Sequence, residues 1–131
     1  DTSVAVAAMQ AGHSMHAACV AAVRRYRPAL AGHAAYETFS VLTRLPGDAK
    51  LGATTARAAI RATFHDVVWL TGKQSAALLN RLAVVGITGG GVYDALVGEA
   101  ARVNGHTLLT CDARARTTYD VLGVPYLLVA S

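Results

Sequence analysis

Residues 91–112 read GVYDALVGEAARVNGHTLLTCD, and this stretch carries the pattern that decides the fold. Its first part, Gly91–Val103, has the spacing of apolar residues that predicts a helix. After a turn, the continuous apolar run Thr107–Thr110 predicts a strand that is covered on both faces. Asp94 falls in the first turn of the helix, and Asp112 comes directly after the strand. A helix followed by a buried strand indicates one unit of an α/β fold.

The same alternation of short apolar runs and helical patterns extends along the whole chain. Further strands are predicted by the runs at Ala29–Ala31, Val67–Leu70 and Tyr126–Val129. The other helical patterns lie at Ser14–Tyr26, His33–Leu45, Thr54–Phe64, Gly72–Val85 and Ala113–Leu122. No repeat or linker divides the sequence, so we expect residues 1–131 to form a single domain. The alternation predicts a three-layer α/β/α fold in which helices cover both faces of one parallel sheet.

Composition narrows the class of protein further. The 131 residues are 53% apolar and 15% charged, which excludes a disordered chain. The net charge is +4, and most of the basic residues are arginine, which suits contacts to phosphate. Cys19 and Cys111 are the only cysteines and lack metal-type spacing, so we expect a reducing cytoplasmic location. The uncharged stretch Thr2–Val23 is long enough to cross a bilayer, but polar residues interrupt it, and we expect no membrane insertion.

The start of the sequence lacks one element of the expected fold. Asp1-Thr2-Ser3 runs directly into a helical pattern, which leaves no room for a strand at the beginning of the alternation. In doubly wound sheets the first strand is usually central. We therefore expect a short apolar strand to precede Asp1 in the native protein, so that the first strand is truncated here.

Four of the eight acidic residues are expected to gather at one edge of the sheet. Asp1 and Asp112 follow the carboxyl ends of strands, where open parallel sheets bind ligands. Glu37 and Asp94 lie on helices that follow loops and can approach the same edge. Each also has an ordinary explanation: helix N-caps for Asp1 and Asp112, a dipole partner for Asp94 and a surface position for Glu37. Ordinary solvated positions are expected for the other acids, Asp48, Asp66, Glu99 and Asp120.

Carboxylates that share a cleft repel one another unless cations lie between them. Hard oxygen ligands select Mg²⁺ or Mn²⁺ over Zn²⁺. The four acids together therefore predict a divalent metal site.

The motifs around these acids resemble those of PIN-domain ribonucleases. They read DTSV at 1–4, AYETFSVLTRLP at 35–46, GGVYDAL at 90–96 and LLTCD at 108–112, and the likeness ends with YDVLGV at 119–124. The motifs occur in the expected order over essentially the whole chain. Within the family, the sequence is especially similar to VapC-type toxins of bacterial, above all mycobacterial, toxin–antitoxin pairs. It departs from some members at Arg114, where those members carry a further acid.

The resemblance implies a PIN fold and a Mg²⁺- or Mn²⁺-dependent endoribonuclease. It implies that Asp1, Glu37, Asp94 and Asp112 are both metal ligands and catalytic residues. It further implies an RNA substrate, products with 5′-phosphate and 3′-hydroxyl ends, a VapB-type antitoxin and a homodimer. Two alternatives remain: a catalytically silent PIN-like scaffold, and another metal-dependent phosphoryl-transfer enzyme such as a phosphatase or a DNA-directed nuclease.

Candidate contacts to RNA lie close to the last motif. Arg114 and Arg116 follow Asp112 and can reach a nucleic-acid backbone, and Thr110 is polar at the strand end, where it can hold a metal-bound water. Arg57 and Arg61, one helical turn apart, are the weaker pair. The alanine- and valine-rich segment Val4–Val23, with helix His33–Leu45 as a second wall, is the candidate groove for an antitoxin helix. The alternative is that these small residues pack against the domain's own core.

Overall fold

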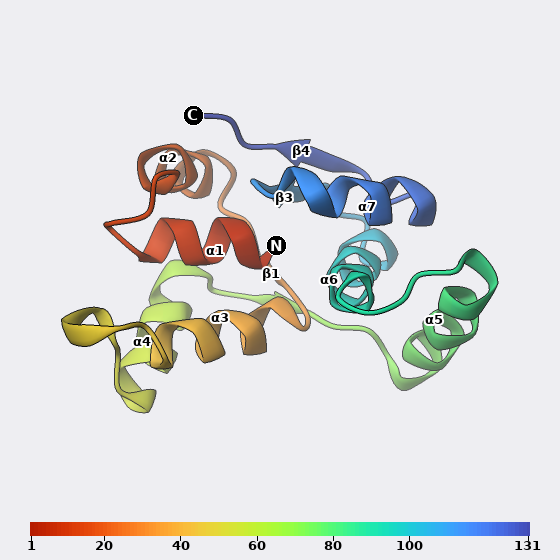
Figure 1. Cartoon of the computed structure of the whole chain (residues 1–131), viewed down its shortest axis with the longest axis horizontal. Coiled ribbons are helices and arrows are strands. Elements are labelled where there is room, and N and C mark those ends of the chain that lie inside the picture. The colour runs from red at the N-terminus through yellow and green to blue at the C-terminus, as the bar shows by residue number, and fades with distance from the viewer.

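The computed structural model describes all 131 residues and alternates helices with short strands, as the sequence predicts (Figure 1). In order, its elements are α1 (Thr2–Met9), α2 (His16–Tyr26), β1 (Leu30–Ala31), α3 (Ala34–Thr43), the 3-10 helix η1 (Gly47–Ala49), α4 (Ala53–Thr63), β2 (Val67–Val68), α5 (Gly72–Val85), α6 (Gly91–Val103), β3 (Leu108–Thr110), the 3-10 helix η2 (Ala113–Ala115), α7 (Arg116–Leu122) and β4 (Tyr126–Leu128). This mixture of helices and parallel strands is an α/β fold.

The helix ends follow local capping chemistry. The hydroxyl of Thr71 accepts from the backbone N–H of Gln74, whose side chain accepts in return, which forms a capping box at the start of α5. The same helix ends at Gly86, whose φ of 76° is the left-handed conformation that favours glycine. The predicted bounds Gly72–Val85 and Gly91–Val103 are therefore confirmed. The predicted helix Ala113–Leu122 is instead divided into η2 and α7.

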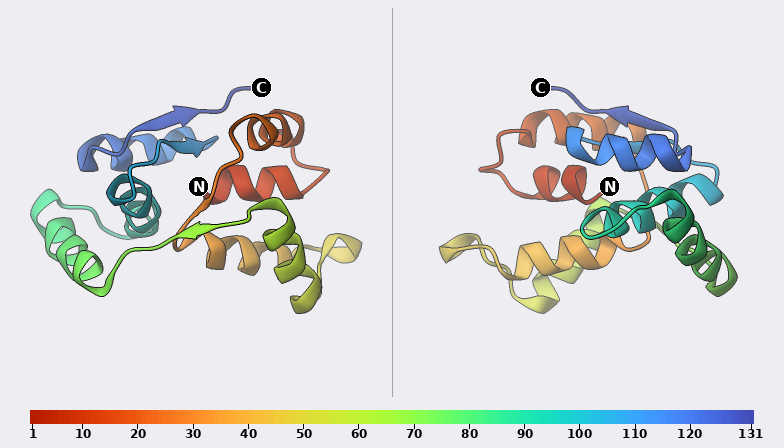
Figure 2. Two further views of the ribbon diagram at one scale, coloured as in Figure 1. Left: turned by 180° about the vertical axis from the view of Figure 1, so that it is seen from behind. Right: turned by 45° about the vertical axis from the view of Figure 1, so that its right-hand side comes forward.

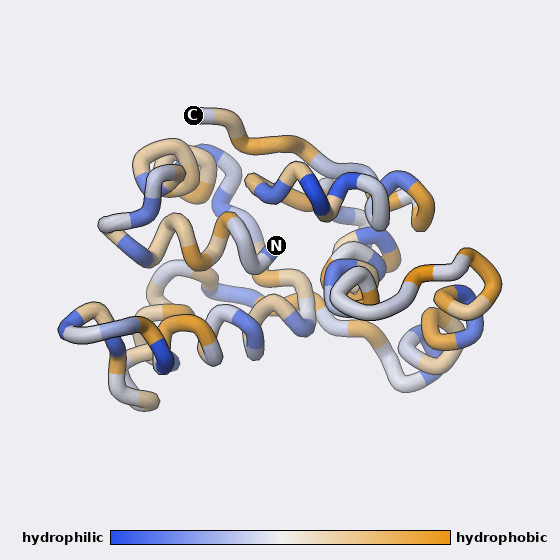
Figure 3. The backbone as a smooth tube through the Cα atoms, viewed as in Figure 1, coloured by the Kyte–Doolittle hydropathy of each residue, from blue (hydrophilic) through white to orange (hydrophobic).

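The strands form two separate parallel pairs, so the prediction of one continuous sheet is wrong. β1 pairs with β2, with Leu30 opposite Val67, and β3 pairs with β4, with Leu108 opposite Tyr126. The expectation that every strand is covered on both faces also fails for β4. Its two leucines are exposed, and Figure 3 shows this apolar segment near the C-terminus in orange.

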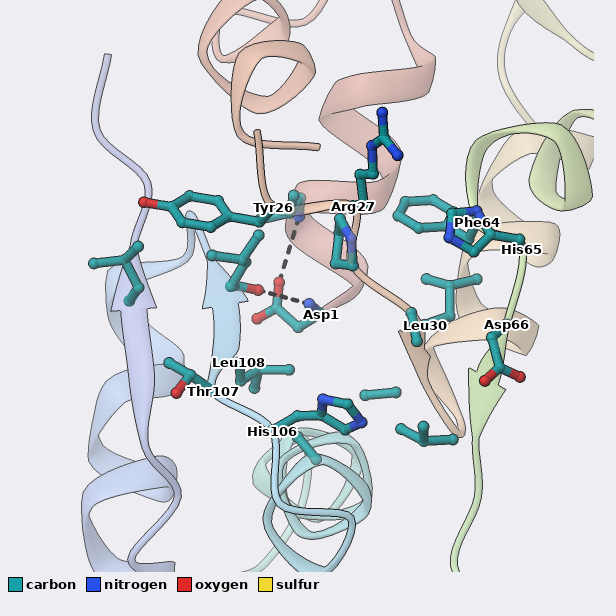
Figure 4. A pocket seen from close by; sticks show the side chains of 18 residues that line it. Asp1, Tyr26, Arg27, Leu30, Phe64, His65, Asp66, His106, Thr107 and Leu108 are labelled. Atoms are coloured by element: carbon teal, nitrogen blue, oxygen red, sulfur yellow. Dashed lines mark hydrogen bonds between the residues drawn. The ribbon is translucent and has the colours of Figure 1, made fainter. Parts of the chain in front are cut away.

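A cavity of about 690 Å³ lies between the two strand pairs. Its wall includes Leu30 and Ala31 of β1 on one side and Leu108 and Leu109 of β3 on the other (Figure 4). Asp1 also borders it, and its nitrogen donates to the carbonyl of Leu109 at 2.6 Å.

Helix α1 lies between α2 and α3 and packs against both (Figures 1 and 2). Val4, Ala5 and Ala7 of α1 are buried, as are Cys19 and Ala22 of α2. These small residues pack in the chain's own core, whereas Ala17 and Ala21 of the same segment are exposed. Helix α1 also packs directly on α3, and a groove there for an antitoxin helix stays a prediction.

The main core joins α3, α4, α5, α6 and α7 with the strands, and Tyr119 is its largest fully buried side chain. Gly98 of α6 lies directly beneath that ring. A Cβ at this position would meet the Tyr119 and Val124 side chains at 3.0 Å, so α6 and α7 approach this closely only over a glycine. No helix in the chain combines the length and the apolar composition needed to cross a bilayer.

Glu99 is buried and paired, which corrects the expectation of a solvated acid. Glu99 is 6% exposed. Its carboxylate accepts two hydrogen bonds from Arg102, from Nη2 at 2.6 Å and from Nε at 2.9 Å. Arg81 of α5 lies 3.7 Å away and also donates to the carbonyl of Leu122, at the end of α7. Hydrogen bonding to Arg102 lowers the pKa of Glu99 and outweighs the opposing effect of burial. Glu99 therefore links α5, α6 and the end of α7.

Replacing Glu99 by alanine is expected to lower the free energy of unfolding by about 1.5–3 kcal/mol, the range for hydrogen bonds to charged groups. Because the folded-state pKa is lowered, this contribution is fully present above the ordinary glutamate pKa of about 4.3 and is lost as the pH falls through the folded value. Urea unfolding at a series of pH values measures it. A difference between wild type and Glu99→Ala that stays constant down to pH 3 would contradict this account. Asp48→Ala, at an exposed acid, is the matched control.

Candidate active site

The four predicted acids all lie at the start of a helix. Asp1 is the N-cap of α1 and Asp112 is the N-cap of η2, directly after β3. Glu37 and Asp94 lie in the first turns of α3 and α6. The capping explanation for Asp1 and Asp112 is thus confirmed. It is compatible with a second role, since each side chain still has oxygen lone pairs free.

Asp1 is fixed by two hydroxyl groups, one from a near neighbour in sequence and one from a distant part of the chain. The phenol of Tyr119 donates to its Oδ2 at 2.8 Å, and the hydroxyl of Ser3 donates to its Oδ1 at 2.5 Å. The same Ser3 oxygen accepts from the backbone N–H of Cys111 at 2.9 Å. These contacts hold the start of α1 against the end of β3 and against α7.

The other acids are tied to the same centre. Thr2 donates to Glu37 Oε1 at 3.0 Å, which brings the start of α3 to the start of α1. The hydroxyl of Thr110 accepts from the backbone N–H of Asp112 at 3.1 Å and lies 3.5 Å from that of Ser3. The strand end and the two helix starts therefore share one hydrogen-bonded network.

Electrostatics show that the four acids face a common region. Burial raises the pKa of Asp94, and the charges of Asp112 and Glu37 raise it further, partly offset by Arg114. Burial also raises the pKa of Tyr119, and the charges of Asp94, Asp112 and Glu37 add to this effect. The Tyr119 phenol thus bonds to Asp1, and the charges of the other three carboxylates reach it.

This donor set fits a hard divalent cation. Carboxylate and hydroxyl oxygens are the ligands that Mg²⁺ and Mn²⁺ prefer. A bound cation would offset the negative charges of the acids, which repel one another. The side chains are not arranged to hold an ion as they stand, because no group of three or more His, Cys, Asp or Glu converges to ligating positions.

The candidate RNA contacts differ in their exposure to solvent: the arginines are exposed, and Thr110 is buried. Arg114 is exposed and forms an ion pair with Asp112, from Nε to Oδ1 at 3.2 Å. Arg116 is exposed and donates to the phenol of Tyr126 at 3.2 Å. Thr110 is fully buried, and its hydroxyl accepts from the backbone N–H of Asp112. Its roles toward RNA and a metal-bound water stay predictions. Arg57 and Arg61 are exposed on α4, which packs on α3.

Sequence reasoning assigned no role to Thr2, Ser3 or Tyr119, which the structure places in the network. Thr2 and Ser3 directly follow Asp1, so their small hydroxyl groups beside a candidate catalytic acid were the available signal. Tyr119 lies more than one hundred residues away from Asp1 in sequence, and only the packing of α7 brings them together.

Comparison with known proteins identifies the family of the chain. The family model described as PIN domain matches residues 1–121. Ribonuclease VapC27 of Mycobacterium tuberculosis is 43% identical over 130 residues, which cover 99% of this chain and 95% of the relative. Ribonuclease VapC40 of Mycobacterium tuberculosis is 42% identical over 130 residues, covering 98% of this chain and 96% of the relative. No solved structure matches significantly. The chain therefore belongs to the PIN-domain family and is a VapC-type member of it.

Proposed function

We propose that this chain is an endoribonuclease that hydrolyses RNA phosphodiester bonds with a divalent cation, and that it is the toxin of a toxin–antitoxin pair. The observation that supports the proposal is the environment of the Tyr119 phenol, which donates to Asp1 and whose pKa is raised by burial and by the charges of Asp94, Asp112 and Glu37. The ribonuclease names of the relatives, at 42–43% identity over nearly the whole chain, support the same activity.

The four acids would hold the cation, and hydroxyl groups orient two of them. Tyr119 and Ser3 orient the carboxylate of Asp1, and Thr2 orients that of Glu37. Burial and the nearby acids raise the pKa of Asp94, so its charged carboxylate would gain stabilisation from a bound cation. When bound, a divalent cation supplies an activated water at neutral pH and offsets charge on the leaving oxygen.

Arg114 is placed to exchange partners during the reaction. Its guanidinium pairs with Asp112, yet its side chain is 93% exposed and free to turn outward. An exposed ion pair contributes little, so the guanidinium would leave Asp112 readily and contact an RNA phosphate beside the site. Arg114 would thus bind substrate and shield the carboxylates when substrate is absent.

The two alternative functions have less support. A catalytically silent scaffold has no use for four retained acids, of which Asp94 is held at an electrostatic cost. A phosphatase or DNA-directed nuclease would use the same metal chemistry, but the VapC relatives carry ribonuclease names. The comparison of an RNA strand with a DNA strand of the same sequence separates these activities.

Removal of divalent cations is expected to abolish cleavage of single-stranded RNA, and Mg²⁺ or Mn²⁺ is expected to restore it. A second readout does not depend on activity: Mg²⁺ should raise the midpoint of thermal unfolding, since a ligand that binds only the folded state stabilises it. Asp48→Asn should keep both effects, because Asp48 is exposed in η1 and outside the network. Cleavage that persists in excess EDTA would refute the metal-dependent mechanism.

The toxin proposal includes a VapB-type antitoxin, a homodimer and a cytoplasmic location, where the RNA substrate is found. Because α1 packs directly on α3, an inhibitor would have to approach the acids from outside this helix pair. An inhibitor arginine could replace Arg114 as the partner of Asp112. Co-expression with the neighbouring open reading frame should yield a complex without ribonuclease activity, and a neighbour that neither binds nor inhibits would contradict the toxin role alone.

A further inference from the structure

A row of four aromatic rings lies on the surface beside the candidate active site. The ring centroids of Tyr93 and His33 are 5.4 Å apart and nearly parallel, at 19°. Those of His33 and Tyr36 are 6.2 Å apart, and those of Tyr36 and Trp69 are 5.7 Å apart in an edge-to-face arrangement. We call these four residues the aromatic row. It joins the start of α3, the start of α6 and the residue after β2.

Three of the four rings in the aromatic row are at least half exposed to solvent. Tyr36 is 64% exposed, Tyr93 51% and Trp69 50%. Aromatic side chains contribute most when buried, so a contiguous set left at the surface is typical of a binding site. Most of the other exposed large apolar residues are aliphatic and lie on α5, α7 and β4.

The backbone under the aromatic row is held tightly. Gly32 has a φ of 50°, and a Cβ there would approach the Ala100 side chain at 3.2 Å and the Val68 carbonyl at 3.4 Å. This close junction of β1, β2 and α6 fixes the direction in which His33 leaves the strand. Asn104 donates to the Trp69 carbonyl at 3.2 Å and to the Ala100 carbonyl at 2.7 Å, which ties the residue after β2 to α6. The rings therefore stand on a rigid support.

The aromatic row borders a hollow of about 160 Å³, with His33, Tyr36 and Trp69 in its wall. Pockets that enclose a drug-sized ligand usually measure about 300–1,000 Å³. This hollow is smaller, so it suits one planar group rather than a whole ligand. The hydroxyl-bearing Ser75 also lines it and offers a polar contact at its edge.

The position of the aromatic row connects it with the proposed reaction. Tyr36 directly precedes Glu37, and Tyr93 directly precedes Asp94. Both pairs lie in the first turns of α3 and α6, so the aromatic row and these two acids are carried by the same two helix starts. Single-stranded RNA exposes unpaired bases that stack on aromatic side chains, whichever base is present. We infer that the aromatic row is a stacking platform for unpaired RNA bases that flank the cleaved phosphodiester, an inference that rests on the proposed function.

Trp69 provides a direct measurement, because it is the only tryptophan in the chain. The probes are an octaadenylate RNA and an abasic octamer with the same phosphates but no bases, both added to the Asp94→Asn protein to prevent cleavage. Octaadenylate is expected to quench Trp69 fluorescence, and the abasic octamer is not. Trp69→Ala, followed by fluorescence anisotropy of labelled probes, should weaken octaadenylate binding about tenfold or more and leave abasic binding unchanged.

Tyr26→Ala is the matched control, since Tyr26 is 47% exposed but stands over Arg25 at the end of α2. It should leave both affinities unchanged. Equal quenching by the two probes, or an unchanged octaadenylate affinity in Trp69→Ala, would overturn the inference. A third contrary outcome is that Trp69→Ala binds RNA normally but has a different molar mass in solution from wild type. The aromatic row would then be a protein interface. RNA cleavage by wild type without base-dependent quenching would refute the platform alone, whereas quenching without cleavage would refute the proposed function alone.

Discussion

Asp94→Asn is expected to reduce the rate of RNA cleavage by more than about a hundredfold. Asparagine keeps the size of the side chain but removes the negative charge that would hold the cation. Loss of a residue that merely supports a metal ligand already costs about 10–100-fold, so loss of a ligand should cost more. The measurement is the single-turnover cleavage rate of a labelled RNA at saturating Mg²⁺.

The same variant should fold normally, and this separates a chemical defect from a structural one. Because the folded protein raises the pKa of Asp94, it disfavours the charged carboxylate. Removing that charge should therefore leave the midpoint of thermal unfolding unchanged or higher in the absence of metal, and should diminish the further rise on adding Mg²⁺. Asp48→Asn, an equal charge change at an exposed acid, should keep wild-type cleavage. Wild-type rates in Asp94→Asn would refute the role given to this carboxylate.

Much of the architecture could be predicted because its determinants are local. The capping box at Thr71 and the left-handed Gly86 delimit α5 through contacts within a few residues, so a sequence pattern suffices to place it. The acids at helix starts and strand ends were predictable for the same reason. Asp1 and Asp112 are N-caps, and capping is a short-range interaction.

Contacts between residues far apart in the sequence could not be predicted in this way. Apolar runs do not specify which strands are neighbours, so the division into two pairs around a cavity was missed. Glu99 was expected to be solvated because its pairing depends on Arg81 of another helix as well as on Arg102. The aromatic row joins residues from three segments, and neither helical nor strand periodicity indicates such a junction.

Tyr119→Ala is expected to lower the free energy of unfolding by about 3–5 kcal/mol, the usual cost of truncating a large buried aromatic side chain. Tyr119 is fully buried in the main core, its ring lies against Gly98 and Val124, and it contacts the ring of Tyr126. Denaturant unfolding measures the loss. Tyr26→Ala, at an exposed tyrosine, should change stability by less than about 0.5 kcal/mol.

Tyr119→Phe distinguishes the packing of this residue from its hydrogen bond. The ring and its core contacts remain, while the O–H that donates to Asp1 at 2.8 Å is lost. Because the pKa of Tyr119 is raised, the phenol stays protonated at any working pH and acts only as a donor to the carboxylate. Tyr119→Phe should therefore keep most of the stability but cleave RNA about tenfold more slowly, since Asp1 loses one of its two orienting hydroxyl groups. If Tyr119→Phe cleaves as fast as wild type while Tyr119→Ala unfolds easily, Tyr119 serves the core alone and Asp1 is positioned by Ser3.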